Sequence, residues 1–169
     1  APVLLEKPLA HEPEAMEAHR KRPTSVMVGY MLRFHPGVRK LREMVQDGVL
    51  GKLRSGQVVA HTFMPDWHGY EKPGDYYVGQ KALGGGTILP NIHLIDLLDW
   101  ILGMPRRLWC LGGKLSDLEI DVEDTIAALF DYEIDGAAVP VAMHLSFVQR
   151  PQVNRMTFLG SRGEIFWDL

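Results

Sequence analysis

The chain has 169 residues, of which 46% are hydrophobic and 23% are charged, and it carries a formal net charge of −3. This length and composition suffice for one buried core with a small appended lobe. The negative charge and the lack of any long basic run exclude nucleic acid and an anionic membrane as partners. We predict that the short basic cluster at residues 20–22 is the solvated end of a helix.

The sequence holds one cysteine, Cys110. An internal disulfide framework is therefore excluded, and we expect a reducing compartment, the cytoplasm. No apolar run approaches the roughly 20 residues that span a bilayer. The first ten residues, APVLLEKPLA, lack the basic-then-apolar order of a secretion signal. They open without a methionine inside a strand-like run, which predicts that the chain is a fragment of a longer protein.

The first 30 residues predict a βαβ unit with a right-handed crossover, because a short buried strand, a helix and a second buried strand follow one another. The first strand stops at Glu6-Lys7-Pro8, since proline fixes its own φ and restricts the residue before it. A charged pair therefore stands at the carboxyl end of a strand. The three elements are expected at residues 3–5, 12–20 and 25–28.

The next stretch changes to the helical spacing of apolar residues and has Gly48 where a helix would end in the left-handed conformation, so we predict a helix over residues 36–47. Residues 52–63 predict a strand. The following loop, MPDWHGYEKPGDYY at 64–77, is too long and too aromatic for a plain connection. Long loops of this kind often line sites.

The second half of the chain predicts one amphipathic helix, which ends at Gly103, and then only strands. Asp135-Gly136 is a hairpin signal, because both central positions of a type I′ turn need positive φ. Together these elements predict an α/β (α+β) chain whose open, mainly antiparallel sheet has helices on one face. The helix is expected at residues 92–102, and the strands near 107–112, 123–133, 138–148, 154–160 and 164–168.

Several short catalytic motifs are absent from the sequence. It contains no G-x-G-x-x-G or G-x-x-x-x-G-K-[ST] phosphate loop, no G-x-S-x-G nucleophile elbow and no H-E-x-x-H zinc helix. The chain therefore lacks a dinucleotide cradle of its own. We predict no metal site, because the candidate ligands match none of the zinc spacings. These candidates are His61, Asp66, His68, His93 and Asp96.

His93 and Asp96 share one face of the predicted helix and follow a run of three glycines, which would let the backbone pass close to a ligand. The imidazole is either a general acid or base or an ordinary, satisfied helix histidine. Lys7 has a similar pair of interpretations. It ends a strand where ligands bind in α/β sheets, or it is an exposed lysine before a proline turn.

Several of these signals occur together, in order and spacing, in one family. The chain resembles the glucose–fructose oxidoreductase, inositol dehydrogenase and rhizopine catabolism proteins (Gfo/Idh/MocA) from residue 3 to residue 168. The motifs that carry the resemblance are E-K-P at 6–8, G-Y-x-L-R-F-H-P at 29–36, P-D-W at 65–67, A-L-G-G-G-T-I-L-x-x-I-H-L-I-D at 82–96 and W-I-L-G at 100–103.

This resemblance implies a two-domain NAD(P)-dependent oxidoreductase that acts on a sugar, a polyol or a sugar derivative. Residues 1–30 would be the C-terminal remnant of its Rossmann domain. Residues 31–169 would be a substrate-binding and oligomerisation domain, cut short at its end, whose open sheet supports a homo-oligomer. We expect the chain by itself to be inactive and not to bind the cofactor, because the phosphate loop is missing.

The resemblance also implies roles for single residues. Lys7 would stand between the nicotinamide and the substrate hydroxyl, while Glu6 and Pro8 shape the pocket for the cofactor's carboxamide. His93 would exchange the hydroxyl proton during hydride transfer. The glycines would let the chain reach the substrate. Candidate substrate contacts are Arg33, Asp66, Trp67, Tyr76, Tyr77, Asn91 and Asp96.

Alternatives stay open for two of these contacts and for the function. Arg33 either holds an acidic group of the ligand or pairs with a nearby carboxylate, and Trp67 is either a ligand contact or a core aromatic. Leu89 and Pro90 stand where the family often has an aspartate before the histidine, and Asn91 would replace part of its hydrogen bonding. Met31 replaces an expected asparagine. The rival hypothesis is a non-catalytic binding or dimerisation module built on the apolar sheet face.

Overall fold

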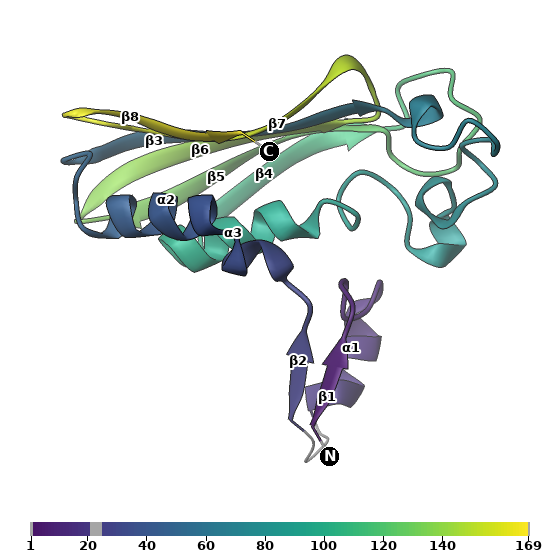
Figure 1. Ribbon diagram of the computed structural model, residues 1–169, viewed down its shortest axis with the longest axis horizontal. Helices are drawn as coiled ribbons and strands as arrows, with labels where there is room; N and C mark the ends of the chain where they lie inside the picture. Colours follow the sequence, from purple (N-terminus) through teal and green to yellow (C-terminus); the bar gives the residue numbers. More distant parts are fainter. Residues whose placement is uncertain (1, 21–24, 169) are drawn as a thin grey trace.

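The computed structural model describes residues 2–20 and 25–168. The chain forms a six-stranded sheet with helices against one face, and a small βαβ unit stands on the helical side (Figure 1). This is the α/β architecture expected from the sequence. No helix among the described residues is long and apolar enough to cross a membrane. Of the predicted basic cluster, residues 21 and 22 lie outside the described ranges.

The small unit consists of β1 (Val3–Leu5), α1 (Pro13–Arg20) and β2 (Val26–Val28). The two strands pair in parallel, with Val3 opposite Val26. The predicted strand, helix and strand are thus confirmed, but the expected burial of the two strands was wrong, since Leu4 and Met27 are 71% and 54% exposed. The parallel pairing places the residues that follow both strands at the same end of the unit, and this end faces the rest of the chain (Figure 1).

The large sheet has the strand order β4-β5-β6-β3-β7-β8. Only β3 and β6 pair in parallel, and every other neighbouring pair is antiparallel. The sheet is therefore mainly antiparallel, as predicted. Its strands are β3 (Leu53–Phe63), β4 (Arg107–Gly113), β5 (Thr125–Ile134), β6 (Ala137–Ser146), β7 (Val148–Gly160) and β8 (Gly163–Asp168).

Two helices, α2 (Pro36–Gln46) and α3 (Ile92–Leu102), cover one face of this sheet (Figure 1). Alternate residues of β6, such as Val141 and Leu145, are fully buried and belong to the same core cluster as Leu97 of α3. Each such side chain contributes roughly 1.5–3 kcal/mol by leaving water. Four short 3₁₀ turns complete the described part of the chain: η1 (Met31–Phe34), η2 (Met64–Asp66), η3 (Tyr77–Gly79) and η4 (Lys81–Leu83).

The hairpin between β5 and β6 is confirmed, because Asp135 and Gly136 both have positive φ, 52° and 75°. The predicted end of β6 and start of β7 were wrong. Strand β6 ends at residue 146, and Phe147 lies at the bend between β6 and β7 and belongs to a second, smaller core cluster. Strand β7 begins at 148 rather than 154 and tolerates Pro151 by means of a register shift opposite residues 61–63 of β3, since proline cannot donate to a regular ladder.

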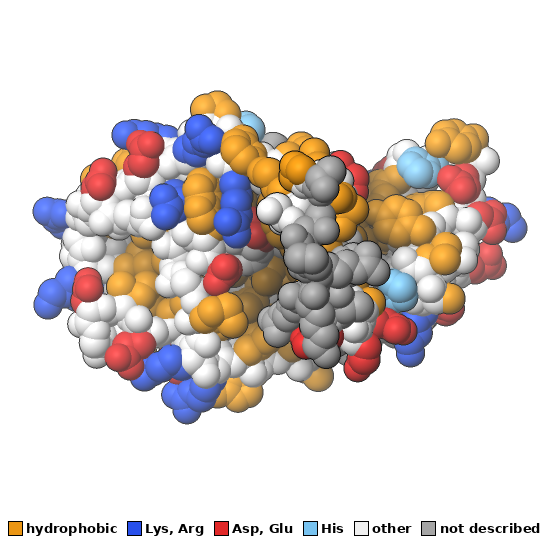
Figure 2. All heavy atoms as spheres, turned by 90° about the horizontal axis from the view of Figure 1, so that it is seen from below, with side chains coloured by type: hydrophobic (Ala, Val, Ile, Leu, Met, Phe, Trp, Pro, Cys, Tyr) orange, Lys and Arg blue, Asp and Glu red, His pale blue; other side chains and the backbone are white. Residues whose placement is uncertain are grey.

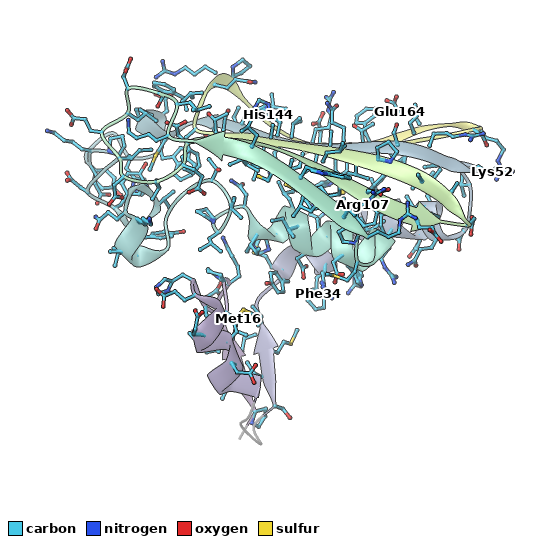
Figure 3. All side chains as sticks on the ribbon, turned by 180° about the vertical axis from the view of Figure 1, so that it is seen from behind. Met16, Phe34, Lys52, Arg107, His144 and Glu164 are labelled. Carbon is cyan, nitrogen blue, oxygen red and sulfur yellow. The ribbon has the colours of Figure 1, made fainter. Side chains whose placement is uncertain are left out.

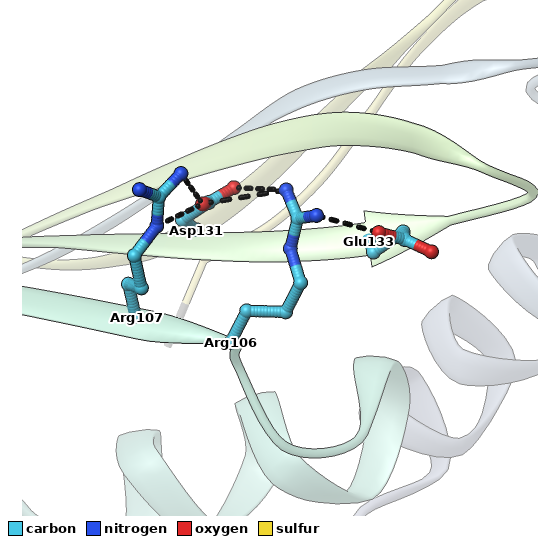
Figure 4. A network of polar contacts seen from close by, with 4 residues as sticks. All are labelled: Arg106, Arg107, Asp131 and Glu133. Carbon is cyan, nitrogen blue, oxygen red and sulfur yellow. Dashed lines mark hydrogen bonds and ion pairs between the residues drawn. The ribbon is translucent and has the colours of Figure 1, made fainter.

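No helix of residues 2–20 or 25–168 covers the other face of the sheet. His144 and Glu164 project from it (Figure 3). Across β4 and β5, Trp109 lies opposite Leu129 and both are more than two-fifths exposed. At one end of these strands the apolar surface gives way to a network of four charged side chains, Arg106, Arg107, Asp131 and Glu133 (Figure 4).

Candidate active site

The end of β1 is joined to the segment before α3 by Lys7. This side chain is half-buried, and its Nζ donates a hydrogen bond to the carbonyl oxygen of Pro90 at 2.7 Å. Pro90 lies three residues before His93. Two positions that are 86 residues apart in the sequence, and that come from the two parts of the fold, are therefore held near each other.

His93 lies in the first turn of α3, against the ring of Tyr30, which follows β2. The two rings meet edge to face, with centroids 6.0 Å apart and planes at 80°. Nδ1 of His93 is buried and has no hydrogen-bond partner among the described residues. Tyr30 therefore constrains the imidazole by packing, and none of the described groups fixes it through Nδ1.

Burial lowers the pKa of His93, and the positive charge of Lys7 lowers it further, while Asp96 and Glu6 act in the opposite direction. Burial also lowers the pKa of Lys7, against the attraction of Glu6. Both shifts have desolvation as their largest cause. The imidazole is accordingly neutral near neutral pH and able to accept a proton, with a cation close by.

Arg33 and Asp96 bind each other. Nε and Nη2 of Arg33 donate to the two carboxylate oxygens of Asp96 at 2.8 and 2.6 Å. Asp96 is nearly buried, and the guanidinium lies 5.8 Å from the centre of the Tyr30 ring and 5.7 Å from that of Trp100. Of the two interpretations of Arg33, this geometry supports pairing with a nearby carboxylate.

A small pocket of about 100 Å³ lies beside the N-terminus of α3. Trp67 forms part of its wall and donates from Nε1 to Oγ1 of Thr62 at 2.6 Å. Viewed from the side of the βαβ unit, the molecule is indented between this unit and the lobe at one end, and hydrophobic side chains lie in the indentation (Figure 2). The pocket is lined by Ala60, His61, Thr62, Trp67, Asn91, Gln152, Val153 and Asn154.

Two amide side chains of this pocket, Gln152 and Asn154, were missed by sequence reasoning. A signal was present for Asn154, because it alternates with Met156 and Phe158 on the helix-covered face of β7 and interrupts an apolar series. Its Oδ1 is buried and has no partner among the described residues. Asn91, which was predicted, lines the same pocket and donates from Nδ2 to the carbonyl oxygen of Thr87 at 2.9 Å.

Three buried side-chain polar atoms in the described part of the chain lack a partner, namely Thr87 Oγ1, His93 Nδ1 and Asn154 Oδ1. Thr87 and His93 belong to the segment that contains Asn91, and Asn154 shares a pocket with Asn91. Folded proteins satisfy nearly all buried polar groups, so each exception asks for an explanation. Here all three exceptions belong to the segments that meet at the N-terminus of α3, which makes this place the candidate binding site.

The three glycines before α3 have a different role from the one expected. A Cβ at Gly85 would lie 2.4 Å from the carbonyl oxygen of Val78, and one at Gly86 would lie 2.2 Å from Oε1 of Glu123. Gly84 has positive φ and lies against the side chain of His11. These residues are glycines because the chain packs tightly on its own neighbours. Close approach to a substrate is not needed to explain them.

The remaining predicted contacts lie in the loop after β3. Asp66 is exposed and ion-paired with Arg150, which lowers the pKa of its carboxyl group. Tyr76 is buried, and its hydroxyl donates to the carbonyl oxygen of Met64 at 3.2 Å. Tyr77 is 51% exposed. The structure brings Trp67 and Asn91 together in the pocket, while these three residues do not line it.

Two other features of the described residues were considered as sites. A groove of about 560 Å³ lies between residues 74–80 and 114–121, and its lining includes the acidic side chains of Asp117, Glu119 and Asp121, but it contains none of the three side chains that have an unpaired buried atom. In the described part of the chain no three histidine, cysteine or carboxylate side chains gather in a way that would hold a metal ion.

The fold and the candidate site together define a class of α/β proteins. In this class a mixed sheet with helices on one face lies next to a βαβ unit, and a lysine and a histidine lie where the two parts meet. The model of the GFO/IDH/MocA C-terminal domain matches residues 38–166. Because the match covers well over half of the chain, the chain belongs to the GFO/IDH/MocA family.

Relatives in this family carry out different reactions. The chain is 26% identical to myo-inositol 2-dehydrogenase of Thermotoga maritima over 175 residues, which cover 98% of this chain and 49% of the relative. It is 27% identical to 2,7-anhydro-N-acetylneuraminate hydratase of Escherichia coli over 119 residues, which cover 68% of this chain and 31% of the relative.

The fold is shared with solved structures. The WlbA dehydrogenase of Bordetella pertussis, in complex with NADH and UDP-GlcNAcA, superimposes with a TM-score of 0.83 over 99% of this chain and 49% of its own, at 20% sequence identity. The chain spans between 27% and 53% of the length of the curated relatives it matches.

Proposed function

We propose that this chain is the substrate-binding part of an NAD(P)-dependent oxidoreductase, which transfers hydride between a sugar, a polyol or a sugar derivative and a nicotinamide. The observation that carries the proposal is the meeting of Lys7 with the segment that contains His93. In this proposal residues 1–30 are the end of the dinucleotide-binding domain, and residues 31–169 are the substrate domain. Relatives named as inositol dehydrogenases support this assignment.

In the proposed reaction His93 takes the proton of the substrate hydroxyl. Its lowered pKa keeps the imidazole neutral, which is the form that can accept this proton. Lys7 uses one N–H in the bond to Pro90 and keeps its other N–H groups for the oxygen on which negative charge develops. The positive charge of Lys7 also disfavours a second cation at His93. In this proposal Lys7 stabilises the developing negative charge and His93 transfers the proton.

The residues of this chain fit one end of the cofactor. Glu6, Lys7 and Pro8 follow β1 at the carboxyl end of a parallel pair, where α/β sheets bind ligands. The sequence has no glycine-rich phosphate loop, so these residues would hold only the nicotinamide end. When bound, the nicotinamide accepts or supplies the hydride. Two solved structures of the same fold, GenD2 and WlbA, are complexes with NAD and with NADH.

The pocket beside α3 is suited to a polyhydroxyl ligand. It combines the half-exposed ring of Trp67 with the amides of Asn91, Gln152 and Asn154. Amides both donate and accept hydrogen bonds, as hydroxyl groups do, and an aromatic face packs against the C–H groups of a sugar ring. The two open interpretations of Trp67 are compatible, because its ring also contacts buried Phe147, with centroids 5.4 Å apart.

The decisive experiment uses the complete protein of which this chain is part. We expect NAD(P)H formation with a panel of sugars and polyols, and a fall of about 100-fold or more in kcat for Lys7→Met with the fold retained. Glu164→Gln, on the open face, is the matched control and should keep full turnover. Unchanged turnover in Lys7→Met would contradict the proposal. The 169-residue chain alone should not bind NADH tightly in a fluorescence titration, and tight binding would contradict the assignment of its cofactor contacts.

A second candidate function is assembly. The uncovered sheet face exposes Trp109, Leu111 and Leu129, which are 51%, 81% and 43% exposed. Apolar side chains on adjacent strands form a surface that a partner would cover. We propose that this face binds a second copy of the protein in solution. Leu129→Arg should convert an oligomer to a monomer in light-scattering chromatography, whereas Met104→Arg, outside the sheet, should not. An unchanged mass in Leu129→Arg would exclude this interface.

A further inference from the structure

The carboxylate of Asp96 lies one helical turn beyond His93, the candidate proton acceptor, yet it makes no hydrogen bond to the imidazole Nδ1. Asp96 follows His93 at the i+3 position of α3, within reach of the imidazole along the helix face. Both of its oxygens are instead taken by Arg33 of η1, at 2.8 and 2.6 Å. Nδ1 of His93, the buried nitrogen without a partner, is left without this carboxylate.

The guanidinium is fixed in place by several contacts. The guanidinium of Arg33 lies against the rings of Tyr30 and Trp100. Nε of Arg39 donates to the backbone carbonyl oxygen of Arg33 at 3.2 Å, which holds the main chain of η1. A two-pronged Arg–carboxylate pair holds the carboxylate in one orientation, which a lysine cannot do. The negative charge of Asp96 is therefore paired with Arg33, and its carboxylate is oriented towards η1.

The orientation of the Asp96 carboxylate matters for the protonation of His93 because several charged groups surround the imidazole. Lys7, from the end of β1, opposes a positive imidazole, whereas Glu6 from the same segment and Asp96 from α3 favour it. Tyr30, from the end of β2, contacts the ring and is neutral, since burial raises the pKa of its phenol. Among these groups Asp96 is the one whose charge another side chain has paired through both oxygens.

We infer that Arg33 is a positioning residue that acts on His93 through Asp96. By binding both carboxylate oxygens, it keeps Asp96 away from Nδ1 of His93 and so keeps the imidazole neutral and ready to accept a proton. Without Arg33, Asp96 would turn to the imidazole and stabilise its charged form. This inference rests on the proposed function for its meaning, but its test does not require turnover.

The test is an NMR titration of His93 in the protein, with labelled histidine and with His93→Gln to assign the signal. In Arg33→Gln the midpoint should move to higher pH, because the freed carboxylate favours the imidazolium. In Arg33→Gln combined with Asp96→Asn this upward shift should vanish. Arg155→Gln, which breaks the bidentate pair of Arg155 with Asp168 on the open face, is the matched control and should leave the midpoint unchanged.

Two outcomes would overturn the inference: an unchanged midpoint in folded Arg33→Gln, or an equal upward shift with and without the Asp96 carboxylate. If Arg33→Gln does not fold, Arg33→Lys decides, because it keeps the charge but loses the two-pronged geometry. A smaller upward shift then supports the inference, and none refutes it.

The activity of the complete protein gives a separate readout. The acidic limb of kcat/KM in Arg33→Gln should move to higher pH, with about a tenfold loss at low pH for each unit of displacement. A shifted NMR midpoint in a protein without turnover would refute the proposed function and leave this inference standing.

Discussion

Two buried polar groups of this protein, Asp124 and His93, are treated in opposite ways. Asp124 is fully buried, and its oxygens accept from the backbone N–H groups of Leu115 and Ser116 and from the hydroxyl of Ser116, at 2.7–3.0 Å. These bonds lower the pKa of its carboxyl group against the opposing effect of burial. His93 is buried at Nδ1 with no partner among the described residues.

The difference in hydrogen bonding between Asp124 and His93 distinguishes a group that stabilises the fold from a candidate catalytic group. A carboxylate that only holds a loop is worth burying when all of its acceptor capacity is used, because an unpaired buried charge is very unfavourable. An imidazole that must accept a proton has to keep a nitrogen free. The two regions also meet in space, since Oε1 of Glu123, next to Asp124, accepts from the backbone N–H of Ile88 in the segment that leads to α3.

The largest effect expected from this comparison is on catalysis. In the complete protein, His93→Ala should lower kcat by about 100-fold or more, because loss of a positioned acid or base removes this much. Steady-state assays of NAD(P)H formation would measure it, and circular dichroism should show an unchanged fold. His144→Ala, on the open sheet face, is the control. Equal rates for His93→Ala and the parent would remove His93 from the chemistry and end the contrast with Asp124.

Asp124→Ala should have the opposite profile. It leaves two backbone N–H groups and a hydroxyl without their acceptor, so we expect a loss of about 3 kcal/mol in the free energy of unfolding. Urea denaturation measures this loss. Asp117→Ala, an exposed aspartate in the same loop, should change stability by less than about 0.5 kcal/mol. Similar values for the two variants would mean that Asp124 is not the structural anchor of this loop.

The glycine run joins the two regions and gives a third, smaller effect. Gly85→Ala places a methyl group 2.4 Å from the carbonyl oxygen of Val78 and 2.6 Å from that of Tyr77. We expect a loss of about 2 kcal/mol from overpacking, measured by thermal unfolding. A Cβ at Gly113 meets nothing within 4 Å, so Gly113→Ala should be near neutral. A neutral Gly85→Ala would restore the interpretation that the glycines serve ligand approach.

The smallest effect is a pH dependence of stability. Burial lowers the pKa of both His93 and His61 from the ordinary value of 6.5. The unfolded chain therefore binds more protons below this value, so stability is lost as the pH falls through 6.5. The shifted aspartates act in the same direction only nearer their ordinary value of 3.8. Denaturation at several pH values should show a smaller loss in His93→Gln than in the parent, and an equal loss would remove His93 as a cause.

Local patterns were enough to predict nearly every element of this fold. The alternation of Val139, Val141 and Leu145 predicted β6, and Asp135-Gly136 predicted the turn before it, because side-chain period and backbone preference act over a few residues. The boundary between β6 and β7 was wrong for a non-local reason. Phe147 keeps the inward side that the alternation gives it, but its backbone N–H donates to the carbonyl oxygen of Asp124 and its carbonyl oxygen accepts from the N–H of Met64, both far away in sequence.

The sequence by itself determined the elements, the family resemblance and the residue types at the cleft, Lys7 and His93 among them. Only the tertiary structure decided their partners. It gave Pro90 to Lys7, Arg33 to Asp96 and Arg150 to Asp66, and it assigned the glycines to packing. Propensity and periodicity are properties of neighbouring residues, whereas hydrogen-bond partners and desolvation depend on which distant segments the fold brings together.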